Sequence, residues 1–476
     1  SGTLSVEDLD AVTEKLKKSS SRRVDLKDLA EGVAGASGDH SIDTDYLLRL
    51  IDLSNRINDA HHRLVAGEHG LGRARYGLAV AGGTAAEWAG AFPHNPFQAP
   101  VIIDMTGDAA QLSAGLVEGH LDETTELVRL LRLARLEIDQ PDGVDWKREA
   151  LASLRWQDLS REDLAMCPPL VLLGSDEMLA GRGLSQLIWL LNSGLPVKVL
   201  VLSALHFGLL EAPTNDPRGS LGLLALAQRN AFVAQTSVAN PDHLGDSILQ
   251  ALAFDGPALI QAYAPSPAQH GFASNQTVAQ AQSAVAARVL PLFRYDPRGE
   301  GVFGSRISLD GNPACEEALI KLDDSEQFLT PADWARGQSR FDGQFEPLGD
   351  KAPGPVALHE WLQLDDIGRV AKTPFIAASD DENEQRYSVS PALARVSAQC
   401  LANWQTLQEL AGLVTPFTAQ VEEKIRAEVA AEHQAELDAQ KKASDEQIRE
   451  IQDKTQAEIA KNIRSRLLEL ASRKRN

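Results

Sequence analysis

The chain has 476 residues, of which 43% are hydrophobic, and its formal net charge is −21 with a pI of about 5.0. This length allows two or three domains with packed cores. The acidic balance argues against a nucleic-acid-binding protein, because contacts to phosphates need a basic surface. It is typical of a cytoplasmic protein, or of one that docks a basic partner.

The cysteines and the hydropathy of the sequence exclude further classes of protein. Cys167, Cys315 and Cys400 are the only cysteines, and no two of them are closer than 85 residues. A disulfide framework and an iron–sulfur cluster ligated by this chain alone are therefore not expected. No run of 18 apolar residues occurs, so no membrane span is predicted. The chain starts at Ser1 without a signal core, which fits a trimmed or tagged chain or a piece of a longer polypeptide.

Residues 1–65 are predicted to form a helical N-terminal region. Ser5 is placed as an N-cap, and residues 46–57 carry apolar side chains at helical spacing. The glycine-rich residues 66–83 lack a GxGxxG pattern after a clear strand, which favours turns over a phosphate loop. A short buried strand is predicted over residues 101–105. Helices are predicted over residues 113–137 and 147–166, with a helical insertion at about 125–166.

From Pro169 onward, short apolar strands alternate with helices. This alternation predicts an α/β domain over residues 66–300, with a parallel sheet that helices cover on both faces. A short crossover should place the first of these strands beside the second, and ligands of such sheets bind at the carboxyl ends of the strands. The predicted strands are 171–173, 197–202, 231–237 and 258–263, and the predicted helices are 184–192, 219–230 and 243–253.

The last part of the chain changes in composition. Residues 301–416 predict a mixed extension with many Pro and Gly residues, whereas residues 417–476 contain neither. Acidic and basic residues balance in this last segment, and a thin apolar stripe runs along it. It is predicted to be one long helix, which either forms a coiled coil with a partner or lies on its own domain.

Three segments carry a resemblance to a known family. They are residues 169–202, residues 256–264 and the stretch that ends in Pro291-Leu-Phe-Arg-Tyr-Asp-Pro297. In this order and spacing they resemble the thiamine-diphosphate-binding, C-terminal (beta-type) region of pyruvate:ferredoxin (flavodoxin) oxidoreductases, in the 2-oxoacid:ferredoxin oxidoreductase family. The resemblance implies a thiamine-diphosphate-binding fold and oxidative decarboxylation of 2-oxo acids, with electrons leaving through iron–sulfur clusters to ferredoxin or flavodoxin.

The cofactor-binding residues implied by the resemblance are mostly replaced. Gly174, Ser175 and Asp176 stand where the family has Gly-Asp-Gly, so Asp176 is the candidate carboxylate ligand of Mg²⁺. In the family, the next strand is followed by the sequence Asp-Thr-Glu-Val-Tyr-Ser-Asn-Thr-Gly-Gly. Here it leads into Ser203-Ala-Leu-His-Phe-Gly-Leu-Leu-Glu-Ala212, whose apolar side chains cannot supply oxygen ligands. We therefore expect thiamine diphosphate and Mg²⁺ to bind weakly or not at all.

The iron–sulfur ligand of the family is replaced as well. Ser266 stands where the family carries Cys, and serine is a poor ligand for iron–sulfur chemistry. Clusters or flavin are therefore expected only on partner chains. His206, at a strand end, is a weak candidate for acid–base catalysis, with a hydrogen-bonded structural histidine as the alternative. His61-His62, Glu68 and His69 are weak candidates for metal ligands, with a solvated helix end as the alternative.

Two functions remain open from the sequence. In the first, the chain is a diverged thiamine-fold subunit or domain of a redox complex, incomplete as a catalyst by itself. In the second, it is a non-catalytic scaffold that keeps the fold for dimerisation and binds partners through the long helix. Both predict association, with a second copy, with cluster-carrying subunits, or with both.

Overall fold

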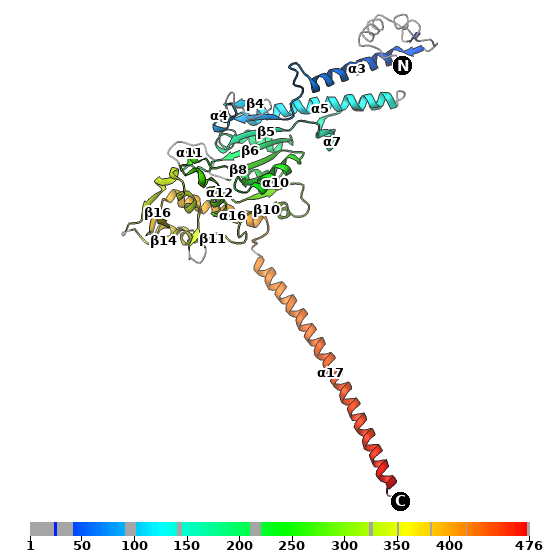
Figure 1. The fold of residues 1–476 in the computed structure, drawn as a ribbon, viewed down its shortest axis with the longest axis vertical. Coiled ribbons are helices and arrows are strands. Elements are labelled where there is room, and N and C mark those ends of the chain that lie inside the picture. The colour runs from blue at the N-terminus through cyan, green and yellow to red at the C-terminus, as the bar shows by residue number, and fades with distance from the viewer. Residues whose placement is uncertain are drawn as a thin grey trace. The chain divides into compact units, whose positions relative to one another are not determined.

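The computed structural model describes residues 23–25, 41–90, 101–139, 145–209, 220–322, 327–349, 352–380, 383–415 and 417–473. The chain divides into two units, residues 1–411 and residues 412–476, and each is described by itself. The first unit is an α/β structure built on a large sheet, and the second is a single long helix (Figure 1).

The large sheet has eight strands in the order β10-β9-β7-β8-β6-β5-β3-β4. The six strands from β7 to β4 run parallel. At one edge β9 pairs antiparallel with β7, and β10 pairs antiparallel with β9. The strands are β3 (Gly77–Ala81), β4 (Val101–Asp104), β5 (Leu170–Ser175), β6 (Val197–Ser203), β7 (Phe232–Ser237), β8 (Ala258–Tyr263), β9 (Phe293–Tyr295) and β10 (Ile307–Ser308).

The parallel sheet predicted from the sequence is confirmed. Strand β5 lies beside β6, with Leu172 level with Val199, as the short crossover predicted. Apolar residues fill these strands because helices bury both faces, so every side chain of β7 and β8 is buried. Strand β3 was not predicted, because only five residues separate the glycine-rich turns that flank it.

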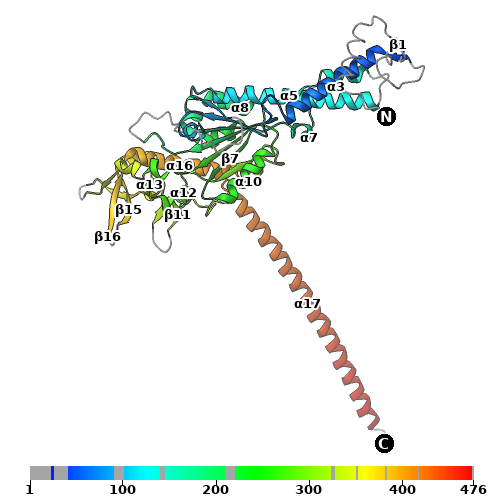
Figure 2. The same cartoon turned by 45° about the horizontal axis from the view of Figure 1, so that its top comes forward.

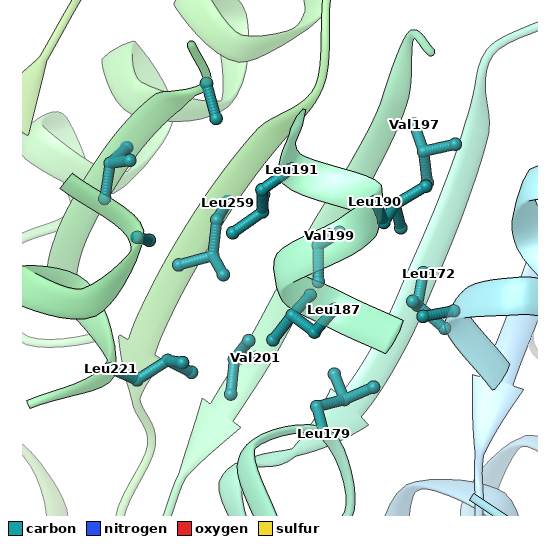
Figure 3. Close-up of a cluster of buried hydrophobic side chains, with 14 of the residues drawn as sticks. Leu172, Leu179, Leu187, Leu190, Leu191, Val197, Val199, Val201, Leu221 and Leu259 are labelled. Atoms are coloured by element: carbon teal, nitrogen blue, oxygen red, sulfur yellow. The ribbon is translucent and has the colours of Figure 1, made fainter. Parts of the chain in front are cut away.

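Helices pack on both faces of the sheet (Figure 2). Helices α5 (Ala109–Asp139), α8 (Leu184–Asn192) and α9 (Leu221–Gln228) cover one face, and α4 (Thr84–Gly90) and α10 (Pro241–Leu252) cover the other. Figure 3 shows Leu187, Leu190 and Leu191 of α8 over Val199 and Val201 of β6. All five side chains are at most 1% exposed, so this contact forms the centre of the main core.

The N-terminal region differs in part from the expected helices. Strands β1 (Arg23–Asp25) and β2 (Ser41–Asp43) pair antiparallel, and only then does helix α3 (Thr44–Val65) begin. Helix α3 packs on α5 through a small cluster around Leu53, Ala60 and Leu130. The predicted N-cap Ser5 lies outside the described residues.

The strand over residues 101–104 exists, but the expectation that it is buried is wrong. It forms β4 at the edge of the sheet, and Ile102 and Ile103 are 36% and 38% exposed. An apolar run of this length therefore marked a strand correctly but could not distinguish an edge from the centre of a sheet.

Between α5 and β5, and again after β8, short helical segments connect the larger elements. Helices α6 (Asp145–Ala152) and α7 (Arg161–Leu164) follow α5, and a π-helix (Glu177–Arg182) follows β5. Helix α7 begins with a capping box in which Ser160 and Asp163 bond each other's backbone N–H groups. The segments after β8 are α11 (Pro267–His270) and α12 (Thr277–Ala286).

Residues after β10 build a second sheet and the helices that attach it to the first. The order of this sheet is β13-β16-β15-β14. Its core joins α12, α13 and α16 and includes Trp334 and Phe341. The elements are β11 (Ile320–Lys321), β12 (Phe328–Leu329), α13 (Pro331–Arg336), β13 (Phe345–Pro347), β14 (Pro355–Ala357), α14 (Leu358–Trp361), α15 (Asp366–Val370), β15 (Thr373–Asp380), β16 (Asn383–Val389) and α16 (Pro391–Leu410).

Arg288 fixes helix α16 against the main sheet. Its guanidinium lies 4.2 Å from the ring centre of Trp404 and donates to the carbonyls of Ala314 and Glu317. Trp404 donates from its indole N–H to the same Glu317 carbonyl at 2.9 Å. Since Arg288 and Trp404 are fully buried, this contact holds residues 301–411 to the α/β sheet as one unit.

The second unit consists of helix α17 (Thr418–Arg473), as the sequence predicted for residues 417–476. Its 56 residues correspond to a length of about 84 Å. Among the described residues, no helix is both long and apolar enough to cross a membrane.

We expect deletion of residues 418–476 to leave the first unit folded. Helix α17 belongs to a separate unit and supplies none of the residues of the buried clusters. The midpoint of urea unfolding, followed by tryptophan fluorescence, should therefore match that of the full chain. A truncated protein that precipitates or unfolds at lower urea would show that α17 stabilises the first unit.

Candidate functional site

A cavity of about 470 Å³ opens at the carboxyl ends of the central parallel strands. Its walls come from the segments after β5 and β6, from β7 and β8, from the start of α9 and from one side of α16. Leucine and valine side chains line much of it, and its polar groups come from Asp176, Ser220, Gln235, Gln261, Arg395, Gln399 and Asn403. This is the edge of the sheet at which the sequence predicted a ligand site.

Asp176 is the predicted site residue that lines the cavity, and its carboxylate joins the ends of two strands. Oδ1 accepts from the backbone N–H of Glu177 at 3.1 Å, directly after β5. Oδ2 accepts from the backbone N–H of Ala204 at 3.1 Å, directly after β6. Asp176 is only 6% exposed, and each of its two oxygens accepts a backbone hydrogen bond.

Burial sets the ionisation of Asp176. It raises the pKa of this carboxyl above its usual range, while hydrogen bonds from the backbone of Ala204, Leu205 and Glu177 and from the Ser203 hydroxyl oppose the shift. The net effect favours the protonated form, and no cationic side chain is among the groups that oppose the shift.

Gly174 and Ser175, the other predicted cofactor-binding residues, lie in β5 and do not line the cavity. A Cβ on Gly174 would lie 2.8 Å from Leu179 and 2.9 Å from the Cβ of Ala81. Glycine is therefore needed here for the π-helix to pack against β3. Ser175 Oγ accepts from the backbone N–H of Met178 at 3.4 Å, at the start of that helix. Such π-helical turns are rare and occur often at functional sites.

The segment after β6 brings apolar side chains to the cavity. Leu205, Phe207 and Leu209 line it, and Leu205 and Phe207 both have a φ of 56°, in the left-handed region that non-glycine residues rarely adopt. Two strained residues in this position show that the surrounding packing determines the path of the segment.

Two glutamines that were not predicted line the cavity side by side, and each is hydrogen-bonded to other groups of the protein. Gln235 of β7 lies level with Gln261 of β8 and donates to the Pro291 carbonyl at 2.6 Å. Gln261 accepts from the Gly222 N–H at 3.0 Å and donates to Ser203 Oγ at 2.8 Å. Glutamine in otherwise apolar, fully buried strands was the signal that could have identified them.

His206, the candidate acid–base residue, does not line the cavity. Its Nδ1 lies 3.0 Å from Nη1 of Arg340, so this nitrogen accepts and Nε2 carries the proton. Burial, together with the positive charge of Arg340, lowers the pKa of His206 to about 4. The ring is therefore neutral at pH 7 and contacts the edge of His270, as in the structural alternative.

The other metal candidates stay apart. No group of three or more His, Cys, Asp or Glu side chains that could hold a metal ion occurs among the described residues, and His61, His62, Glu68 and His69 are exposed. The three cysteines are free thiols, and burial raises the pKa of each, to about 12 for Cys400. Such thiols are poor nucleophiles and poor metal ligands at neutral pH.

Comparisons with known proteins place the chain near one group of enzymes. No family model matches it. It is similar to pyruvate-flavodoxin oxidoreductase of Rhodospirillum rubrum, with 26% identity over 227 residues, which cover 43% of this chain and 18% of that protein. It is also similar to pyruvate:ferredoxin oxidoreductase of Moorella thermoacetica, with 37% identity over 79 residues, which cover 16% of this chain and 7% of that protein.

A solved structure, 2-oxoglutarate:ferredoxin oxidoreductase from Magnetococcus marinus, matches 45% of this chain and 62% of its own length at 13% identity, with a TM-score of 0.26. The two sequence matches support a relationship to the 2-oxoacid oxidoreductases. The chain spans less than a fifth of the length of these curated relatives.

We expect Asp176→Asn to destabilise the first unit by about 1–2 kcal/mol at neutral pH, because the amide NH₂ would face one of the two backbone N–H donors. A raised folded-state pKa means that ionisation of Asp176 opposes folding. This carboxyl therefore favours folding at pH values below its unfolded pKa, and the effect is lost as the pH rises through the folded pKa. The difference in the free energy of unfolding between the wild type and the variant, measured by urea unfolding, should consequently grow as the pH is lowered. A difference that shrinks towards low pH would contradict this assignment.

Proposed function

We propose that this chain is a diverged thiamine-fold subunit or domain of a redox complex related to the 2-oxoacid:ferredoxin oxidoreductases, and that it contributes structure instead of thiamine chemistry. The similarity to two such enzymes supports the relationship. The use of Asp176 as a link between strand ends supports the loss of the cofactor site.

The described residues do not fit thiamine diphosphate with its divalent cation. Such a cation needs several oxygen ligands, yet both oxygens of Asp176 accept backbone hydrogen bonds. Ala204, Leu205 and Leu209 follow β6 where oxygen ligands would be needed, and apolar side chains around an anionic diphosphate leave its charge uncompensated.

Electron transfer in the proposed complex would use groups on other chains. Ser266, which replaces the cluster cysteine of the family, precedes helix α11 as its N-cap residue. The three free cysteines lie in different elements or loops and form no ligand group among the described residues. Iron–sulfur clusters or flavin on partner subunits, and ferredoxin or flavodoxin as the acceptor, are the partners that this proposal implies.

The alternative is a scaffold without any part in redox chemistry. Helix α16 covers one side of the cavity, and the amides of Gln235 and Gln261 at its base donate to the Pro291 carbonyl and to Ser203 Oγ. A separate long helix suits assembly. A subunit of a redox complex should co-purify with cluster-carrying subunits, whereas a scaffold without a part in redox chemistry should not. Affinity isolation of the complex from its native cells distinguishes the two functions.

Thiamine diphosphate with Mg²⁺ should not stabilise the purified chain. A ligand at 100 times its Kd would add about 2.7 kcal/mol to the free energy of unfolding. If millimolar ligand does not raise the melting temperature, a Kd far below millimolar is excluded. Calorimetric titration with thiamine diphosphate and Mg²⁺ is the second measurement. Binding that is tighter than millimolar would contradict the loss of the site, and its survival in Asp176→Ala would place the ligand elsewhere.

The chain expressed without partners should contain no iron or acid-labile sulfide. The free thiols have raised pKa values and no common ligand position. Iron and sulfide analysis of protein purified without oxygen measures this directly. Stoichiometric iron that is lost in a Cys315→Ala variant would contradict the proposal that clusters reside on other chains.

A further inference from the structure

The outer side of helix α10 carries an apolar surface, which we call the α10 stripe. Ile248, Leu249 and Leu252 are 37%, 67% and 48% exposed. Because each residue turns the helix by about 100°, these side chains lie within about 100° of its circumference, and Gly245 lies between them. The residues that face the sheet lie on the other side of the helix and are His243, Ser247 and Ala251. The α10 stripe is therefore one continuous apolar face that the described residues leave uncovered.

The sheet beside α10 is also incompletely covered by the described residues. Leu200 and Leu202 of β6 are half-buried and pack in the clusters of this face. Val199 and Val201, on the opposite face of the same strand, are at most 1% exposed. Since parallel sheets are normally covered on both faces, the surface around the α10 stripe has room for a further layer.

Gly245 is not required by the packing of its own chain. A Cβ at this position would meet no atom within 4 Å. Glycine in the middle of a helix is destabilising relative to alanine, so a contact from outside the chain would explain it. Leu249, one helical turn further on, is the most exposed side chain of the stripe. A hole beside a knob fits a second copy of itself when the two helices run in opposite directions.

The N-terminal half of α10 lies in an acidic surface. Asp242 and Asp246 are both exposed on the helix. Arg294 lies between two carboxylates, 3.6 Å from Asp246 and 3.8 Å from Asp310. Three carboxylates and one guanidinium give this end a net charge of −2.

The C-terminal end of α10 lies in a basic surface. Arg161 and Arg298 both donate to the carbonyl of Ala253, directly after the helix. The other charged groups around this turn are Asp255, Asp296 and Lys198. Three cations and two carboxylates give this end a net charge of +1. An antiparallel pair of α10 helices therefore brings each acidic end to the basic end of the other copy, whereas a parallel pair brings like charges together.

We propose that α10 packs against α10 of a second copy in the antiparallel direction, with the two-fold axis level with residue 247. Leu249 of each copy then fills the space above Gly245 of the other, and the two Ile248 side chains lie beside the axis. Asp242 lies level with Leu252 of the second copy, next to the basic end of that helix. This inference does not depend on the proposed function, because it uses only the surface of the first unit.

The first test places a charge in the α10 stripe of the full chain. Light scattering should give twice 51.4 kDa for the wild type and one chain mass for Leu249→Lys, because the contact would bury an ammonium group without a partner. Leu249 is 67% exposed, so the circular dichroism of the variant should match that of the wild type. Val278→Lys on α12, where the side chain is 55% exposed, is the matched control and should remain a dimer.

The second test exchanges the hole and the knob. Gly245→Leu should give one chain mass, because the new side chain occupies the space of Leu249 of the second copy. A purely structural glycine would not produce this loss, since a Cβ at this position meets nothing in its own chain. Adding Leu249→Gly to this variant restores the composition of the helix and reverses hole and knob, so the dimer should return.

The masses decide between the proposal and its alternatives. A wild type with the mass of one chain would overturn it, and the stripe would then belong to a different protein. A Leu249→Lys or Gly245→Leu variant that remains a dimer would show that the chain associates through another surface. If the exchange variant stays at one chain mass, the antiparallel register is wrong. Loss in both single variants with recovery in the exchange variant would support the proposal.

Discussion

Burial of the parallel sheet on both faces is the constraint on which the rest of the first unit depends. Strands β5 to β8 have no solvent-facing side, so their side chains are apolar and polar groups gather where the strands end. At those ends the chain must turn while its backbone N–H groups remain buried, and each of them needs an acceptor. Asp176 is that acceptor for the segments after β5 and β6. In a sheet that binds an ion, a carboxylate at this position could bind the ion instead. Hydrogen bonding to the backbone and ligand binding therefore compete for the same carboxylate.

The strands and helices from residue 169 to residue 300 could be predicted because their signals are local. Apolar runs such as Val197–Ser203 and breaks such as Ser193-Gly194 define the elements within a few residues of their observed bounds. Strand β3 and the edge position of β4 could not be predicted in this way, because position in a sheet depends on pairing with distant residues. The short strands β1 and β2 are likewise defined by pairing with each other and carry no local signal.

The candidate site could be located from the sequence but not understood from it. The family resemblance and the position at the end of a strand pointed to Asp176, which lines the cavity. What the sequence could not show is that both oxygens of Asp176 are already engaged, that Gly174 is required by the packing of Leu179, or that Arg340 comes from 134 residues away to lower the pKa of His206. Each of these depends on a long-range contact. Gln235 and Gln261 were visible as polar residues in apolar strands, but only the register of β7 and β8 shows that they lie side by side.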